Sequence, residues 1–382
     1  MKYNHTIGIR VGLCAIGTAL ILLALPATAQ SPSPAEARQW CFGSSEISDD
    51  QRIEGCSSLL QADPSNAAAL ANRGRSFRRK GDTQRAVADL SGAIDLAPDN
   101  SRIWFSRGLV YADVGDRDHA IADYTRAIEL KPDNANYWCN RGNSLFGKND
   151  YEHAIADFDQ AIRIDPKFTL CYFNRGTAHA QHREADRALA DFDMAIRLDP
   201  NYAVAYGNRA RVLRDKGDRE RALADFSKSL ELNPNNGGDA YARGEIYFNA
   251  HDYARALEDY DRSIKANPNY PGVFFARCVT HAILRQLPEA LADCDQSLRM
   301  KPNEPYMLDT RALIHLRLGE VDAAIADYDA ALSVKPALDN ALYGRGLARR
   351  KKGDNEGAER DIAAAKAINA GIADSFAVYD IK

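Results

Sequence analysis

The sequence lacks the motifs by which several functional classes are recognised. It has no glycine-rich phosphate loop, no nucleophile elbow and no zinc-protease motif. It also lacks an excess of positive charge, because 53 Asp and Glu outnumber 49 Lys and Arg. Nucleic acid binding depends on cationic side chains, so this balance argues against a nucleic acid partner. We therefore expect a non-catalytic protein with no cofactor and no metal site.

Long apolar runs are absent beyond the first 29 residues, so we expect no membrane span in the rest of the chain. Near the start, Lys2 and Arg10 precede a short apolar run, and Ala27-Thr28-Ala29 has the pattern of a signal-peptide cleavage site. We interpret residues 1–29 as a signal peptide, cleaved before Gln30, and predict an exported protein, periplasmic or secreted. An uncleaved anchor is the alternative.

What the sequence does contain is proline at a constant interval of 34 residues. The set is Pro64, Pro98, Pro132, Pro166, Pro200, Pro234, Pro268, Pro302 and Pro336. A fixed period of this length indicates a tandem repeat. Because proline cannot continue a helix, each one is expected to follow the end of a helix.

Other residues recur with the same period when residue 67 is taken as repeat position 1. Position 20 is always Ala, position 27 is Ala or Ser, position 8 is small and position 24 is mostly aromatic. Positions 4, 8 and 11 share one face of a first helix, and positions 20, 24 and 27 share one face of a second. The small residues allow close packing of the two helices, and the aromatic side chain fills the space beside them.

This pattern resembles the tetratricopeptide repeat. The resemblance covers residues 67–370 as nine repeats. It implies an all-α, right-handed superhelical solenoid of helix-turn-helix units, with first helices lining a concave groove. We interpret residues 30–66 as a loose leader, Ser31-Pro32-Ser33-Pro34, followed by a degenerate capping repeat whose first helix has eroded. Residues 371–382 are predicted to form a C-terminal capping helix.

The resemblance also implies where a ligand binds, because first-helix positions 2, 5, 6, 9, 12 and 13 face the groove in this family. An aromatic row at position 5 with Asn and Arg beside it suits a protein partner that presents an extended peptide. Rings supply contact area, and amides bond the peptide backbone. The candidate groove residues are Phe105, Asn140, Asn143, Phe173, Asn174, Asn208, Arg211, Tyr241 and Phe275.

Two alternatives to peptide binding stay open. The position 5 rings can pack between neighbouring first helices instead of contacting a ligand. The chain can also be a recognition or adaptor subunit for an envelope or cell-wall enzyme that contacts glycan, since aromatic rows suit sugars as well as peptides. The sequence fixes neither the partner nor the oligomeric state.

A charged pair recurs in every repeat, with Arg at position 7 and Asp at position 23. Examples are Arg141 with Asp157 and Arg175 with Asp191. An Arg fork can bind a carboxylate through two parallel hydrogen bonds. We predict a structural ladder of such pairs, within repeats or between neighbours. The functional alternative is that the Arg row binds an acidic ligand.

Six cysteines follow the expected cleavage site, and an exported protein can oxidise them. The predicted pairs are Cys41 with Cys56 in the degenerate repeat, Cys278 with Cys294 at positions 8 and 24 of one repeat, and Cys139 with Cys171 on adjacent first helices. The alternative is that each buried cysteine serves as a small apolar side chain.

Histidine occupies position 11 in three repeats, at His179, His281 and His315. Two of these repeats are adjacent, so their imidazoles can in principle converge on a metal. No Cys, Asp or Glu cluster completes a metal shell, and we interpret all three as packing substitutions for an aromatic residue.

Overall fold

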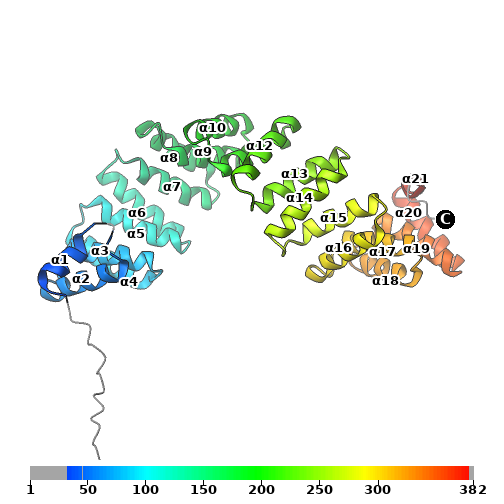
Figure 1. Cartoon of the computed structure of the whole chain (residues 1–382), viewed down its shortest axis with the longest axis horizontal. Coiled ribbons are helices and arrows are strands. Elements are labelled where there is room, and N and C mark those ends of the chain that lie inside the picture. Colours follow the sequence, from blue (N-terminus) through cyan, green and yellow to red (C-terminus); the bar gives the residue numbers. More distant parts are fainter. Residues whose placement is uncertain (1–31, 45, 378–382) are drawn as a thin grey trace, which may run out of the picture. The chain divides into compact units, whose positions relative to one another are not determined.

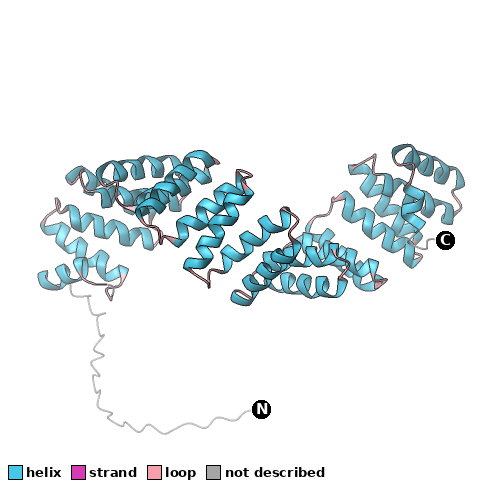
Figure 2. Cartoon of the chain, turned by 90° about the horizontal axis from the view of Figure 1, so that it is seen from above, coloured by secondary structure: helices cyan, strands magenta, loops and turns pink. Residues whose placement is uncertain are grey.

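The computed structural model describes residues 32–44 and 46–377. The expected signal peptide and its cleavage site lie outside these residues. The described residues form helices joined by short loops, and they include no strand (Figure 2). The all-α class predicted from the sequence is therefore confirmed.

The helices follow one another as hairpins of a first and a second helix. Their bounds are α1 (Pro34–Phe42), α2 (Asp49–Ala62), α3 (Ala67–Arg79), α4 (Thr83–Leu96), α5 (Ser101–Asp113), α6 (Arg117–Leu130), α7 (Ala135–Gly147), α8 (Tyr151–Ile164), α9 (Thr169–Gln181), α10 (Ala185–Leu198), α11 (Ala203–Asp215), α12 (Arg219–Leu232), α13 (Gly237–Asn249), α14 (Tyr253–Ala266), α15 (Pro271–Ile283), α16 (Leu287–Met300), α17 (Pro305–Leu318), α18 (Val321–Val334), α19 (Asp339–Lys352), α20 (Asn355–Ile368) and α21 (Ile372–Ala377).

The chain divides into two compact units, residues 1–130 and 131–382. The first unit holds α1 to α6, and the second holds α7 to α21 (Figure 1). Within each unit, the two helices of a hairpin pack against each other, and each second helix packs against the first helix of the next hairpin. Each unit is thus a stack of helical repeats.

Aspartate at repeat position 16 begins many of the second helices. Its side chain accepts a hydrogen bond from the backbone N–H three residues later, which satisfies one of the free donors at the helix start. This cap is present at Asp82, Asp150, Asp218, Asp252 and Asp354.

The residue before this cap, at position 15, has a left-handed backbone conformation. Glycine fills the position in five repeats, with φ between 77° and 92°. Asn149, Arg183, His251 and Arg285 fill it in the other four, with φ between 60° and 64°. A side chain is disfavoured in this region, so these four turns carry a local cost that the glycine turns avoid.

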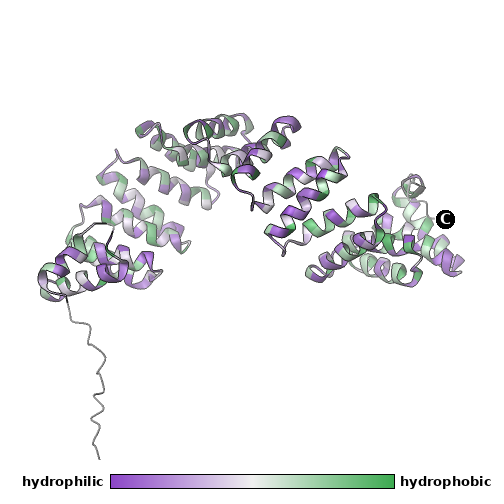
Figure 3. Ribbon diagram, in the orientation of Figure 1, coloured by the Kyte–Doolittle hydropathy of each residue, from purple (hydrophilic) through white to green (hydrophobic). Residues whose placement is uncertain are grey.

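The interior of each hairpin is built from a small residue that faces a ring. A Cβ added to Gly142 would lie 2.8 Å from the ring of Phe158, which is fully buried. The close approach of the two helices therefore restricts position 8 to small residues, and at Gly142 it leaves no room for a Cβ. Figure 3 shows hydrophobic and hydrophilic residues mixed along the helices, as expected for helices that bury one side.

The first hairpin is more complete than the sequence interpretation allowed. The expected loose leader is wrong for Ser33 and Pro34, because α1 begins there: Ser33 and Glu36 form a capping box, and Pro34 occupies the first helical turn. The first helix of this repeat is shortened, not eroded. The Ser-Pro-Ala-Glu sequence was the signal that could have predicted it.

The chain's last described helix, α21, covers the end of the repeat stack. Its Ile372 and Phe376 are buried, and Phe376 packs its ring 4.9 Å from the ring of Tyr343 in α19. Tyr379, the third apolar residue of the expected capping helix, lies outside the described residues.

Candidate binding surface

In the second unit, neighbouring first helices contact one another in two groups. Direct contacts join α7 to α9 and α9 to α11 in one group, and α15 to α17 and α17 to α19 in the other. The first helices of this unit carry the candidate groove residues predicted from the sequence, with Tyr241 on α13 and Phe275 on α15; Phe105 lies on α5 in the first unit.

Asparagine side chains form a row along α7, α9 and α11, one in each of three successive repeats. Asn140 donates its Nδ2 hydrogen bond to the backbone carbonyl of Asn136 at 2.8 Å, and Asn208 donates to that of Val204 at 2.9 Å. Both side chains remain partly exposed, as does Asn174. Their side-chain oxygens accept no hydrogen bond from the described residues, so these acceptors are free to bind a ligand.

Asn143 lies one helical turn after Asn140 on α7 and is exposed. It makes no side-chain hydrogen bond to the described residues. Its amide therefore adds both a donor and an acceptor to the row.

The aromatic candidates are partly exposed but already make ring contacts. Phe173 lies 5.9 Å from Phe192 of its own hairpin and 5.1 Å from Tyr202, measured between ring centroids. Tyr241 contacts Tyr260 and Tyr270 in the same way, at 6.0 and 5.4 Å. These rings serve largely to pack one hairpin against the next.

Two other aromatic candidates also have internal partners. Phe105 lies 5.6 Å from the buried ring of Tyr124. Phe275 packs against the apolar clusters that contain Cys278 and Ala312. The four candidate rings at position 5 therefore make their main contacts with other side chains of the repeats, as the packing alternative predicts.

Arg211, the remaining candidate, is held by a buried carboxylate that the sequence analysis did not single out. Its Nη2 donates to Asp239 at 2.5 Å, and Asp239 is fully buried at the start of α13. Ser229 and Asn236 also donate to Asp239, at 2.5 and 2.8 Å. Arg211 thus contributes to a polar joint between α11, α12 and α13.

Two sequence signals could have revealed this joint. Asp239 occupies repeat position 3, where the other repeats carry mainly apolar side chains. Gly207 lies opposite, and a Cβ added there would approach the Asp239 carboxylate to 2.3 Å. Because Gly207 has no side chain, it leaves room for the carboxylate of Asp239. A glycine combined with an aspartate at a usually apolar position therefore indicates a buried polar contact.

The periodic Arg and Asp residues meet within each repeat. Arg141 donates to both oxygens of Asp157 at 2.8 Å, and Arg175 donates to both oxygens of Asp191 at 2.9 and 2.5 Å. The same two-point contact joins Arg73–Asp89, Arg107–Asp123, Arg209–Asp225, Arg243–Asp259, Arg277–Asp293, Arg311–Asp327 and Arg345–Asp361.

The same arginines also reach the preceding repeat. Arg175 donates its Nη1 to Asp159 at 2.5 Å, and Arg209 donates to Asp193 at 2.6 Å. Asp159 and Asp193 are at repeat position 25. Where this position is Ser, the serine hydroxyl accepts the hydrogen bond in place of the carboxylate, and Arg243 donates to Ser227 at 2.9 Å. One guanidinium therefore fixes its own hairpin and the neighbouring second helix together.

The carboxylates of this ladder are buried, whereas the guanidiniums keep about a fifth of their side-chain area exposed. Hydrogen bonds to Asp225 raise the pKa of Arg209 above its ordinary value, although burial acts in the opposite direction. Because each arginine is occupied by two partners, the row has little capacity to bind an acidic ligand.

Three cysteine pairs lie together in the structure, with the pairing that the sequence predicts. The Cα–Cα distances are 4.7 Å for Cys41–Cys56, 6.0 Å for Cys139–Cys171 and 5.4 Å for Cys278–Cys294, which are distances that a disulfide can span. The first pair lies between α1 and α2. The third takes the place of the glycine–aromatic contact of other repeats.

The position 11 histidines each contact a residue at the start of the next helix. The Nδ1 atom of His179 lies 2.5 Å from Oε2 of Glu184. The Nδ1 atoms of His281 and His315 each lie 2.6 Å from a side-chain oxygen, of Gln286 and Glu320 respectively. No group of three or more His, Cys, Asp or Glu within residues 32–44 and 46–377 is arranged to hold a metal ion.

Comparison with known proteins gives one family. Sequence models described as tetratricopeptide repeat match residues 57–101, 101–134, 135–168, 203–236, 239–270 and 279–342, which is more than half of the chain. No curated protein gives a significant match. In the part of the chain that the structure describes, no helix is long and apolar enough to cross a membrane.

Several solved structures are similar to parts of this chain. MamA is 24% identical, with a TM-score of 0.40, and the match covers 42% of this chain and 93% of MamA. PilF from Pseudomonas aeruginosa is 18% identical, with a TM-score of 0.48, covering 55% and 94%. YrrB, described as a TPR protein with an unusual peptide-binding site, is 20% identical, with a TM-score of 0.44, covering 50% and 98%.

Proposed function

The chain belongs to the tetratricopeptide repeat family, and on that premise we propose that it is a non-catalytic scaffold of the cell envelope that binds an extended segment of another protein. Stacked helical repeats present long surfaces suited to protein interaction. The bound segment lies on the face formed by the first helices of the second unit.

The observation that carries this proposal is the asparagine row of Asn140, Asn174 and Asn208. These residues recur at the repeat interval on successive first helices and are partly exposed, and their side-chain oxygens accept no hydrogen bond from the residues that the structure describes. An extended peptide presents backbone N–H groups at regular intervals, and amide oxygens accept them. The row therefore suits a main-chain ligand better than it suits an isolated side chain.

The glycan alternative is less well supported by the ring contacts. Sugar binding to an aromatic row requires open ring faces, but Phe173 and Tyr241 each contact two other rings. Arrays of glycans and of peptides, both probed with the full chain, distinguish the two. Binding to glycans alone would favour the adaptor function for a cell-wall enzyme.

The envelope location rests on the predicted signal peptide and on the three cysteine pairs. Disulfides persist in oxidising compartments. We expect the mature chain to begin at Gln30 and to fractionate with the periplasm or the medium. An intact N-terminus on exported protein would contradict the proposed cleavage site.

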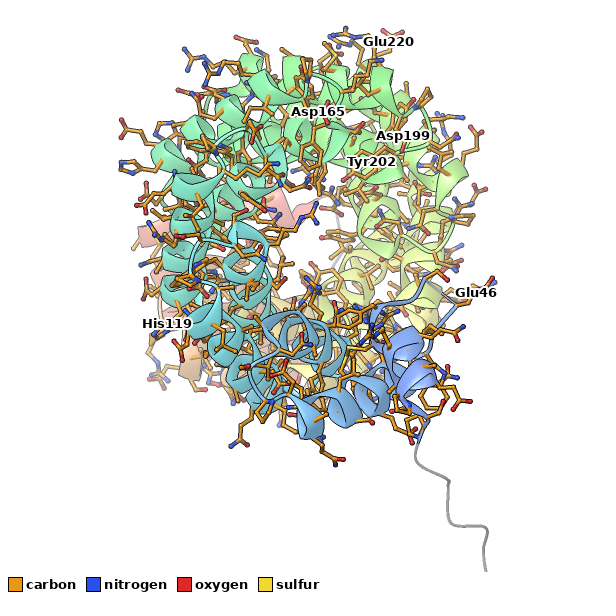
Figure 4. All side chains as sticks on the ribbon, turned by 90° about the vertical axis from the view of Figure 1, so that its left-hand side faces the viewer. Glu46, His119, Asp165, Asp199, Tyr202 and Glu220 are labelled. Atoms are coloured by element: carbon orange, nitrogen blue, oxygen red, sulfur yellow. A yellow bond between two sulfur atoms is a disulfide. The ribbon has the colours of Figure 1, made fainter. Side chains whose placement is uncertain are left out.

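Crosslinking in cells tests the binding face directly. A photoreactive residue at Asn208, on α11, should capture partner protein. The matched control is Glu220, an exposed residue of the second helix α12, which lies at the outer margin of the ribbon (Figure 4). Capture at Asn208 and not at Glu220 supports the proposal, and capture at Glu220 alone would reject it.

A further inference from the structure

A polar cavity of about 430 Å³ lies in the first unit, between the start of α2 and one face of α3 (Figure 1). Its lining includes one apolar side chain, Ile47, and one carboxylate, Asp49; the other lining residues are Ser48, Arg52, Asn72, Arg75 and Arg79. The three lining residues from α3 share one face of that helix, because they are spaced by three and four residues. Three guanidiniums and one carboxylate give this cavity a net positive charge.

Hydrogen bonds to the end of α1 hold two of the arginines in place. Asn72 donates its Nδ2 to the backbone carbonyl of Cys41 at 3.0 Å, and its Oδ1 accepts a hydrogen bond from Nη2 of Arg75. Arg52 donates its Nη1 to the same carbonyl at 3.2 Å, and to that of Gly43 at 3.3 Å. Because the chain itself positions these guanidiniums, a ligand that binds them has a smaller entropy cost to meet.

Within the residues that the structure describes, Arg79 has a carboxylate partner and the other two arginines of the cavity have none. Arg79 donates its Nε to both oxygens of Asp49, at 2.8 and 3.0 Å. Arg52 donates to three backbone carbonyls, and Arg75 donates to a side-chain amide. Burial lowers the pKa of Arg75, and the positive charges of neighbouring arginines act in the same direction. A partly buried cation without a counterion is strongly stabilised when an anion binds beside it.

We propose that this cavity binds the phosphate group of a small soluble phosphomonoester, through the guanidiniums of Arg52, Arg75 and Arg79. Nε of Arg52, Nη1 of Arg75 and Nη1 of Arg79 make no hydrogen bond to the described residues, so these donors are available to phosphate oxygens. The site lies in the first unit and does not involve the asparagine row of the second. It therefore adds a second binding activity to the proposed protein-binding function.

A phosphate fits this arrangement of charges better than a carboxylate does. One guanidinium satisfies both oxygens of a carboxylate, as Arg141 does for Asp157 in the ladder. A phosphomonoester has three acceptor oxygens and carries about two negative charges near pH 8, so it can accept hydrogen bonds from several guanidiniums at once. A lipid is a poorer fit, because Ile47 is the one apolar side chain of the lining.

The test uses phenyl phosphate as the probe, with the full chain, titration calorimetry at pH 8 and methyl NMR of Ile47. Phenyl sulfate, which has a similar shape and one negative charge, and benzoate, a carboxylate on the same ring, are the matched control ligands. We expect phenyl phosphate to shift the Ile47 methyl signals and to bind at least tenfold more tightly than either control. Equal binding of phenyl sulfate, or of benzoate, would overturn the proposal.

Two variants should change the affinity in opposite directions. Arg75→Gln removes the cation that has no counterion, so it should weaken phenyl phosphate binding at least tenfold. Asp49→Asn removes the carboxylate that occupies Arg79, so it should strengthen binding at least threefold. Arg219→Gln, which changes an exposed arginine of α12, is the control and should leave the affinity unchanged. Unchanged binding by Arg75→Gln, or weaker binding by Asp49→Asn at an unchanged unfolding midpoint, would each overturn the proposal.

Two further probes carry the same phosphate group on a macromolecule, namely phosphatidic acid vesicles and a phosphoserine peptide. If either binds more tightly than phenyl phosphate and loses that affinity in Arg75→Gln, the small-ligand assignment is wrong. Weaker binding of both supports a small soluble ligand. Crosslinking at Asn208 without phenyl phosphate binding would reject only the cavity site, and phenyl phosphate binding without any crosslinked partner would reject only the proposed function.

Discussion

The arginine at repeat position 7 shows how one residue type sets the geometry of a repeat. Arg175 joins Asp191 of its own hairpin to Asp159 of the preceding one, so it fixes the angle within the hairpin and the register between hairpins. A carboxylate that loses its arginine, or an arginine that loses its carboxylate, becomes a poorly solvated charge.

Substituting Asp191 by Ala should therefore destabilise the chain by about 3 kcal/mol, because it leaves Arg175 partly buried without its two-point partner. Asp193→Ala is the matched control, since Asp193 is 38% exposed and contacts only one nitrogen of Arg209. Its cost should stay below about 1 kcal/mol. Urea unfolding of both variants measures the difference, and equal costs would argue against the ladder.

Asp309 gives a pH-dependent prediction at the same scale. Burial raises its pKa from 3.8 to about 7 in the folded chain, so folding favours the protonated form. The resulting cost to stability is absent below pH 3.8, grows as the pH rises and is complete above pH 7. Asp309→Asn removes it, so the variant should gain about 4 kcal/mol at pH 8 and about 2 kcal/mol at pH 5.

Urea unfolding at the two pH values checks this prediction, with Asp215→Asn, which changes an exposed aspartate on α11, as the control. An equal gain by Asp309→Asn at pH 5 and pH 8 would show that the carboxylate is not buried as described. A loss of stability at pH 8 would show that ionised Asp309 already has a partner.

At the scale of the helix hairpin, the turn between the two helices affects the stability of the chain. Four turns place a residue with a side chain in the left-handed region that five others assign to glycine. Arg183→Gly should therefore stabilise the chain by about 1 kcal/mol, because glycine adopts this conformation without steric cost.

Asn149→Gly is the comparison for that change, and its gain should be smaller because Asn tolerates the left-handed region. Gly217→Ala should have the opposite effect, a loss of about 1 kcal/mol. Midpoints of thermal unfolding rank the three variants. A lower midpoint for Arg183→Gly than for the parent chain would refute the strain argument.

The predicted disulfide between Cys41 and Cys56 would stabilise a single hairpin. Cys41 and Cys56 join α1 to α2 across 15 residues of sequence, and α1 is a short helix of 9 residues. Losing this bond should cost about 3 kcal/mol by the loop-closure relation. It should also increase hydrogen exchange in α1 before the other helices.

Peptide mapping without reductant, followed by hydrogen exchange of Cys41→Ser/Cys56→Ser, measures both effects. The Cys278→Ser/Cys294→Ser variant is the control for α1, because it removes a bond from another repeat. Free thiols at Cys41 and Cys56 in exported protein would contradict the assignment.

For the molecule as a whole, the periodic residues made the fold predictable from the sequence. Proline, position 8 glycine and position 24 aromatics each have one structural function that is repeated along the chain, so their period predicts the helix pairs. Ser33 and Pro34 were misread because the first repeat is degenerate and a Ser-Pro run resembles a leader as much as a helix start.

The candidate surface was harder to predict, because exposure depends on neighbours that are distant in sequence. Tyr202 and Tyr270 lie between repeats and contact the rings of Phe173 and Tyr241, which the sequence alone placed in the groove. Arg211 likewise has its partner, Asp239, 28 residues away in the sequence, so its position in the repeat does not reveal the contact. Asn140, Asn174 and Asn208 remain partly exposed, as their positions in the repeat predict.

The most direct test of this account measures the affinity of the full chain for the partner segment recovered by crosslinking at Asn208. Asn174→Ala/Asn208→Ala should weaken binding at least tenfold without changing the unfolding midpoint, whereas Glu220→Ala should leave the affinity unchanged. Equal affinities for the parent chain, the double asparagine variant and Glu220→Ala would contradict binding on the first-helix face. A loss of affinity confined to Glu220→Ala would also contradict it.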